Sequence, residues 1–138
     1  MYDCIFVACA LFDQGRTSTA LAKQAMQWLS PGGKLVLIHV INEVPSYVVG
    51  QVPREALSQH QRDAADMLDD IARGISGVQV ETMVRSGTPS TVILNTAEKC
   101  GADLIMIASH KPGLGDYFIG STATRVVRHA QCSVLILR

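Results

Sequence analysis

The 138-residue sequence has no net charge and no long apolar run, and these two absences exclude several classes of protein. Twelve basic side chains balance twelve acidic ones, so the composition does not favour bulk attraction to nucleic acid or to an anionic membrane. No apolar run approaches the roughly 20 residues of a membrane-spanning helix. The first residues, Met1 to Cys4, do not form the basic start of a secretory signal. We therefore expect a cytoplasmic protein that binds neither nucleic acid nor membrane.

Recognisable metal and disulfide motifs are also absent. The four cysteines form no Cys-x-x-Cys pair, and no histidine lies at metal-ligand spacing from them. Each cysteine lies in or beside an apolar segment or a helix end. We therefore expect the cysteines to be small, buried hydrophobic side chains that form no disulfide and bind no metal. Asp63, Asp66 and Asp70 share one face of a predicted helix, but carboxylates along an exposed helix diverge into water. We interpret them as a solvated face and predict no metal bound by protein side chains alone.

What the sequence does contain is apolar segments of strand length that alternate with segments of helical periodicity. A continuous apolar run such as residues 4–10 is typical of a strand buried on both faces. We predict strands over residues 4–10, 34–40, 78–84, 103–108 and 132–137, the third of them half-exposed at an edge. The predicted helices are 17–29, 54–75, 89–100 and 121–130. This alternation predicts one domain over residues 1–138, with a parallel sheet covered by helices on both faces, a three-layer α/β/α fold.

A glycine-rich loop follows the predicted strand 103–108, at a position where ligands bind in such sheets. Ligands of open α/β sheets lie beyond the carboxyl ends of the strands, where strand order reverses. The loop closes on Gly120, Ser121 and Thr122 at the start of a helix, and backbone N–H groups at a helix N-terminus bind phosphate. No lysine follows Gly120, so this is not a Walker A motif. The pattern predicts a nucleotide pocket, and the alternative is a turn that leads into a serine-capped helix.

The C-terminal third of the chain closely resembles the signature of the universal stress proteins. The matching residues are Ile107-Ala-Ser-His-Lys-Pro112, Gly120-Ser-Thr122 and Val126-Val-Arg-His-Ala-Gln-Cys-Ser-Val-Leu135. The resemblance covers the whole chain and is strongest to the small single-domain branch with a Ser-His-Arg-Pro loop. It implies a five-stranded parallel sheet in the order 3-2-1-4-5, of the adenine nucleotide α-hydrolase-like type. It also implies a homodimer, or a tetramer, assembled through the fifth strands, here Val134, Leu135, Ile136 and Leu137.

The resemblance further implies ATP or AMP, with any magnesium held only through the nucleotide, between the ends of the first and fourth strands. The matching positions run from the adenine to the outer phosphates: Val40 through its backbone, Ala8 and Ala10 at the base and sugar, Ala108, His110 and Lys111 at the sugar and first phosphates, and Gly120, Ser121 and Thr122 at the outer phosphates.

The sequence departs from this family pattern in two places. Ala108 and Lys111 occupy the first two glycine positions of the loop, which is one residue shorter than usual. Ala10 replaces the aspartate with which the family holds the nucleotide sugar. A lost carboxylate-to-hydroxyl hydrogen bond weakens binding roughly ten- to hundredfold. Asp13, three residues later, is a possible substitute.

No catalytic residue is predicted. Hydrolysis needs a positioned water and a base within reach, and only His110 and Asp116 are candidates in the loop. The resemblance implies at most slow ATP hydrolysis or self-modification. We expect an adenine-nucleotide-binding stress-response regulator that acts as a homo-oligomer on an unidentified protein partner. The alternative is a nucleotide-free dimeric interaction or signalling module in which the loop is only structural.

Overall fold

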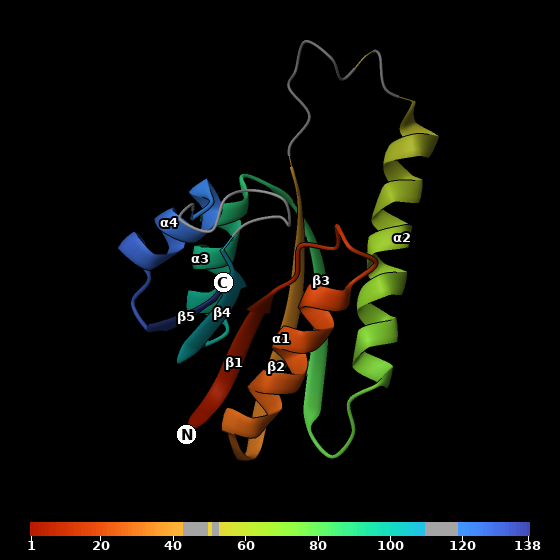
Figure 1. The fold of residues 1–138 in the computed structure, drawn as a ribbon. Coiled ribbons are helices and arrows are strands. Elements are labelled where there is room, and N and C mark those ends of the chain that lie inside the picture. The colour runs from red at the N-terminus through yellow and green to blue at the C-terminus, as the bar shows by residue number, and fades with distance from the viewer. Residues whose placement is uncertain (43–49, 51–52, 110–118) are drawn as a thin grey trace.

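Five strands and four helices alternate along the part of the chain that the structure describes, as the periodicity predicts (Figure 1). The computed structural model describes residues 1–42, 50, 53–109 and 119–138. The strands are β1 (Tyr2–Ala8), β2 (Leu29–Asn42), β3 (Gln79–Gly87), β4 (Leu104–Ala108) and β5 (Ser133–Leu137). The helices are α1 (Arg16–Trp28), α2 (Arg54–Arg73), α3 (Pro89–Lys99) and α4 (Ser121–His129).

The strands form one sheet in the order β3-β2-β1-β4-β5, which confirms the expected topology. Every neighbouring pair is parallel. The central strand β1 places Ile5 beside Leu35 of β2 on one side and beside Leu104 of β4 on the other. The chain fills one half of the sheet with β2 and β3 and then crosses to the other half. Strand order therefore reverses between β1 and β4.

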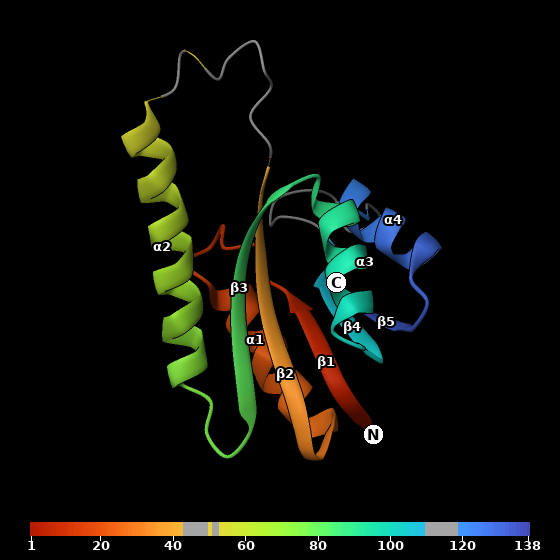
Figure 2. The same cartoon turned by 180° about the vertical axis from the view of Figure 1, so that it is seen from behind.

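The helices cover both faces of the sheet, as Figures 1 and 2 show from opposite sides. Alternation along the buried strands supplies one apolar surface for each face. On one face Ile5 and Val7 pack with Leu21 of α1 and Leu68 of α2. The opposite face of the sheet packs against α3 and α4. The buried side chains of this layer, from the strands and from the two helices, are Cys4, Phe6, Ala8, Val36, Ile38, Ile93, Ala97, Ile105, Ile107, Ala123 and Val126.

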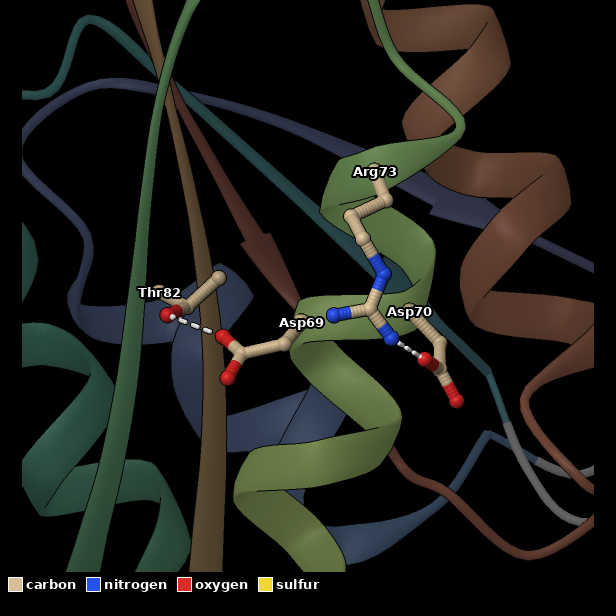
Figure 3. A network of polar contacts seen from close by, with 4 residues as sticks. All are labelled: Asp69, Asp70, Arg73 and Thr82. Atoms are coloured by element: carbon tan, nitrogen blue, oxygen red, sulfur yellow. Dashed lines mark hydrogen bonds and ion pairs between the residues drawn. The ribbon is translucent and has the colours of Figure 1, made fainter.

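The edge strand β3 is joined to α2 by a polar contact (Figure 3). The Thr82 hydroxyl donates to an oxygen of Asp69 at 3.2 Å, and on the next position of α2 Asp70 pairs with Arg73. Asp63, Asp66 and Asp70 are exposed along α2, which confirms the solvated face. No helix in the described ranges is long and apolar enough to cross a membrane.

Two strand boundaries differ from the prediction because they depend on neighbouring strands. β1 ends at Ala8 rather than Ala10, where its ladder with β2 ends at Ile38. β2 begins at Leu29 rather than residue 34, because Leu29 lies beside Tyr2 and the register then shifts before Lys34 pairs with Cys4. The Ser-Pro-Gly-Gly stretch of residues 30–33 is therefore an irregular part of β2 and not a terminating turn.

Two helix predictions were also wrong. The hydroxyls of Thr17 and Ser18 predict an N-cap at one of these residues, but the first helix begins at Arg16 after an N-cap at Gly15. The apolar residues of the fourth helix, Val126, Val127 and Ala130, predict an inward face that includes Val127, but 51% of Val127 is exposed. In α4 the buried residues are Ala123 and Val126, three positions apart. The next position along, Val127, is rotated by about 100° from Val126 and leaves the narrow buried face of this short helix.

Candidate functional site

The residues predicted to bind the nucleotide on β1, β2 and β4 lie on the same side of the sheet, at the carboxyl ends of these parallel strands. Ala8 is the last residue of β1 and lies beside Ile38, two positions before Val40. Ala108 is the last residue of β4. Ala8 is only 8% exposed and belongs to the same buried cluster as Ala123 of α4. The carboxyl edge near the β1–β4 reversal is therefore lined by small and apolar side chains.

The loop after β4 returns to the point where it leaves the strand. The amide of Ser109 donates to the carbonyl of Leu137 at 2.8 Å, which extends the β4–β5 ladder by one bond. The carbonyl of Ser109 then accepts the amide of Gly120 at 2.6 Å. Ser109 itself is only 2% exposed. This bond places the first turn of α4 directly at the end of β4, as the closure on Gly120 predicted.

The first turn of α4 presents backbone donors at this edge. The Gly120 carbonyl accepts both the amide and the hydroxyl of Thr124, at 3.0 and 2.9 Å, so the helix begins regularly. Gly120 has no side chain with which to cap the helix, and the first N–H groups of an α-helix have no partner within the helix. Ser121 is exposed and Thr122 is half-buried. An anion at this point would meet the first backbone amides of α4, two hydroxyls and the positive end of the helix dipole.

The chain beyond β1 is held by β2. The amide of Cys9 donates to the carbonyl of Ile38 at 2.7 Å. The carbonyl of Cys9 lies 2.7 Å from Nδ1 of His39, and because a carbonyl only accepts, the ring nitrogen donates. Ala10, the next residue, is exposed. Sequence reasoning gave His39 no role, although its place next to Val40 at the end of a buried strand was a visible signal.

The carboxylate of Asp13 binds the first turn of α1. One oxygen of its carboxylate accepts the amide of Thr17 at 3.0 Å and the hydroxyl of the same residue at 2.6 Å. These bonds, led by the one from the hydroxyl, hold the pKa of Asp13 below its usual value. The other oxygen is buried and has no hydrogen-bond partner among the described residues. The structure therefore gives Asp13 a helix-capping contact.

Three loop residues that the sequence singled out lie outside the described ranges: His110, Lys111 and Asp116. Their predicted roles stay predictions. Of the remaining predicted residues, Ala8, Ala108 and Gly120 come together through strand pairing and the Ser109–Gly120 bond. Within the described ranges, no group of three or more histidine, cysteine or acidic side chains is arranged to hold a metal ion.

Comparison with known proteins identifies relatives along the whole chain. The family model described as the universal stress protein family matches residues 1–138. A curated relative is the universal stress protein encoded in the 3′ region of the QAH/OAS sulfhydrylase gene of Thermus aquaticus. It is 31% identical over 140 residues, and the alignment covers 100% of both chains.

Solved structures share the fold. UspA from Lactobacillus plantarum superposes with a TM-score of 0.77 at 22% identity, over 99% of this chain and 98% of that one. A universal stress protein from Archaeoglobus fulgidus, solved in complex with dAMP, gives a TM-score of 0.62 at 18% identity and covers 99% and 98% of the two chains. A further universal stress protein structure, solved in complex with cAMP, gives a TM-score of 0.61 at 19% identity and covers 99% of this chain and 97% of that one.

Proposed function

The chain belongs to the universal stress protein family, and from this premise we propose that it is an adenine-nucleotide-binding regulatory protein that acts as a homodimer. The proposed ligand is ATP or AMP, with any magnesium held through the phosphates. Bound nucleotide changes the contacts that the dimer offers to a protein partner.

The observation that carries this proposal is the bond between Ser109 and Gly120. It brings the start of α4 to the end of β4, immediately beside the reversal of strand order. This combination of a helix N-terminus with a topological switch point is the arrangement that α/β proteins use for phosphate-bearing ligands. The outer phosphates would be bound by the amides and hydroxyls of Ser121 and Thr122.

The other proposed contacts follow the sheet edge. Ala8 and Ala108 lie on either side of the reversal. Ala8, together with the exposed Ala10, would line the base and sugar, and Ala108 would border the sugar and the first phosphates. Val40 would bind the adenine edge through its backbone. His110 and Lys111 would border the sugar and the first phosphates. Related proteins of this fold crystallised with cAMP and with dAMP support the choice of an adenine nucleotide.

The second candidate function is a nucleotide-free dimeric interaction module. The observation that favours it is the end of β1, where an exposed methyl group at Ala10 replaces a carboxylate and Asp13 is occupied by Thr17. Under this alternative the loop is structural and the free edge of β5 carries the function. The two candidates differ in one measurable property, nucleotide affinity.

Calorimetric titration of the full chain with ATP and with AMP, each with and without magnesium, tests the proposal. We expect micromolar or tighter binding by the wild-type protein. A Gly120→Val variant should bind about tenfold or more weakly, because a branched side chain would stand where the phosphates approach the first turn. Absence of binding at millimolar nucleotide would overturn the proposal in favour of the interaction module.

A matched control for Gly120→Val is Gly50→Val. A Cβ added at Gly50 would meet nothing within 4 Å, and this glycine lies far from α4 along the chain. The control variant should retain wild-type affinity. Equal loss of affinity in both variants would mean that a valine at either position disturbs the fold and that Gly120 has no special role.

A further inference from the structure

We infer that His39 is a positioning residue for the base end of the proposed site. Its imidazole donates to the carbonyl of Cys9 in place of the backbone amide of Val40. The peptide group of Val40 is then available to recognise a ligand. The inference rests on the proposed function for its ligand, but its geometry stands on hydrogen bonds within the described residues.

The parallel ladder between β1 and β2 sets the backbone hydrogen bonds at this point. Ala8 lies beside Ile38, and the Cys9 amide donates to the Ile38 carbonyl. In a parallel ladder the next bond would run from the amide of Val40 to the carbonyl of Cys9. Among the described residues that carbonyl is instead taken by the His39 ring at 2.7 Å. The side chain of residue 39 thus replaces the amide of residue 40.

Strand geometry then fixes where the Val40 peptide groups point. Residues of a parallel strand direct their N–H and C=O alternately to the two neighbouring strands. Ile38 directs its carbonyl to β1, where Cys9 binds it. Val40, two positions on, therefore also faces the β1 side, where the ladder of β1 has already ended. Its donor and its acceptor are directed at the space beyond the end of β1.

The N–H and C=O groups of Val40 complement the hydrogen-bonding edge of adenine. An N–H and a C=O from one residue offer one donor and one acceptor side by side. The Watson–Crick edge of adenine offers the complement, an acceptor ring nitrogen beside a donor amino group. Loss of the His39 bond would let the Val40 amide return to the Cys9 carbonyl and would remove the donor from the ligand. His39 would thus act through Val40 and not by touching the nucleotide.

The ring also fixes the residue that follows. Cys9 is held at both of its backbone groups, by Ile38 and by His39. The carbonyl of Ala10 accepts the amide of Phe12, so the chain turns immediately after this clamp. His39 therefore sets the position of Ala10 relative to β2, although residue 10 lies outside any strand. The side chain of His39 thus joins the end of β1 to the end of β2.

Two substitutions separate this role from simple packing. His39→Phe keeps a ring of similar size and removes the donor. His39→Asn removes the ring but places an amide nitrogen near the position of Nδ1. We expect His39→Phe to raise the Kd for ATP about three- to tenfold, the effect of one neutral hydrogen bond, and His39→Asn to restore most of that loss. A variant His60→Phe, on the exposed surface of α2, should bind as the wild type does.

Two further readouts do not need nucleotide. Nitrogen-15 NMR of the wild-type imidazole should show a protonated Nδ1 in the neutral ring, and hydrogen exchange of the Val40 amide should slow in His39→Phe. A neutral ring protonated only at Nε2 would overturn the inference, as would unchanged ATP affinity in a folded His39→Phe protein. If the wild-type protein binds no adenine nucleotide, the proposed function fails, and the NMR and exchange results still decide whether His39 frees the Val40 amide.

Discussion

Asp13 and Thr17 are joined by two hydrogen bonds to one carboxylate oxygen, from the amide at 3.0 Å and from the hydroxyl at 2.6 Å. The pair lies where α1 begins, and it supplies the acceptor that Gly15, the N-cap residue, lacks. A carboxylate that accepts such bonds is favoured in its ionised form. The consequence is a pH-dependent contribution to the free energy of unfolding.

We therefore expect Asp13→Ala to destabilise the protein by about 1 kcal/mol at neutral pH. Because the folded-state pKa of Asp13 is lowered from its usual value of 3.8, this stabilisation is present above that usual value and is lost as the pH falls through the folded pKa. Urea unfolding of both proteins between pH 7 and pH 3 measures the difference, which should shrink at the acidic end. A constant difference across that range would contradict the ionic origin of the effect.

The exposed Ala10 predicts weak discrimination among sugars. Ala10 has no hydrogen-bonding side chain at the position where the family resemblance implies a carboxylate for the ribose, and one oxygen of Asp13 is bound to Thr17. We expect ATP and dATP to bind with similar Kd. In Ala10→Asp, the affinity for ATP should rise roughly tenfold over that for dATP, because only the ribose has the second hydroxyl for a charged hydrogen bond.

Parallel titrations of both nucleotides to both proteins test this prediction, and Ala20→Asp, at an exposed position of α1, controls for the added charge. An Ala10→Asp protein that still fails to distinguish the two nucleotides would mean that residue 10 does not approach the sugar.

The free lateral edge of β5 is where we expect the proposed dimer to form. The Leu137 carbonyl faces β4, where Ser109 binds it, and strand alternation then turns the backbone groups of Val134 and Ile136 toward the free edge. Both side chains are half-buried in the isolated chain. We expect Ile136→Pro, which removes a free-edge donor, and Leu135→Glu, which adds a charge to the strand, each to yield monomer in sedimentation velocity measurements.

Gln27→Glu, exposed on α1, provides the control and should sediment as the wild type does. Circular dichroism separates loss of assembly from loss of fold. A folded Ile136→Pro protein with unchanged sedimentation would exclude pairing through β5.

The cysteines should differ in reactivity. Burial raises the pKa of the Cys9 thiol to about 12, and the side chain is only 3% exposed. Since the thiolate is the reactive form, Cys9 should not react with an aromatic disulfide reagent at pH 8 in the folded protein, whereas the half-buried Cys100 and Cys132 should react first. Counting thiols before and after denaturation measures this, and a Cys9→Ser variant that loses a rapidly reacting thiol would refute it.

The sequence was sufficient for the order of elements because its signals are local. The apolar run from Cys4 predicts β1, and Pro89 after Thr88 predicts the start of α3. A glycine directly after a helical pattern predicts a helix end, and the structure has Gly101 in the left-handed region at φ 70° after α3. Each of these depends on a few consecutive residues, and the sheet order followed from the family resemblance.

The features that the sequence could not predict arise between distant segments. The start of β2 at Leu29 depends on its pairing with Tyr2, and the role of His39 depends on a carbonyl 30 residues away. The residue pattern around Leu29 or around His39 does not indicate which distant residue it will contact. The closure of the loop on Gly120 was predictable because glycine, serine and threonine at a helix start are a local signal.

At the opposite end of the sheet, the carboxylate of Asp103 accepts the amides of Asp3 and Cys4, at 2.9 and 3.0 Å. These bonds join the start of β1 to the start of β4, which follows about 100 residues later in the sequence, so the central strand is synthesised well before one of its two neighbours. Until β4 emerges, a nascent chain that has completed β3 exposes an open, apolar edge of β1, the kind of edge that recruits other chains. We therefore expect a chain truncated after Cys100 to aggregate under conditions in which the 138-residue chain folds.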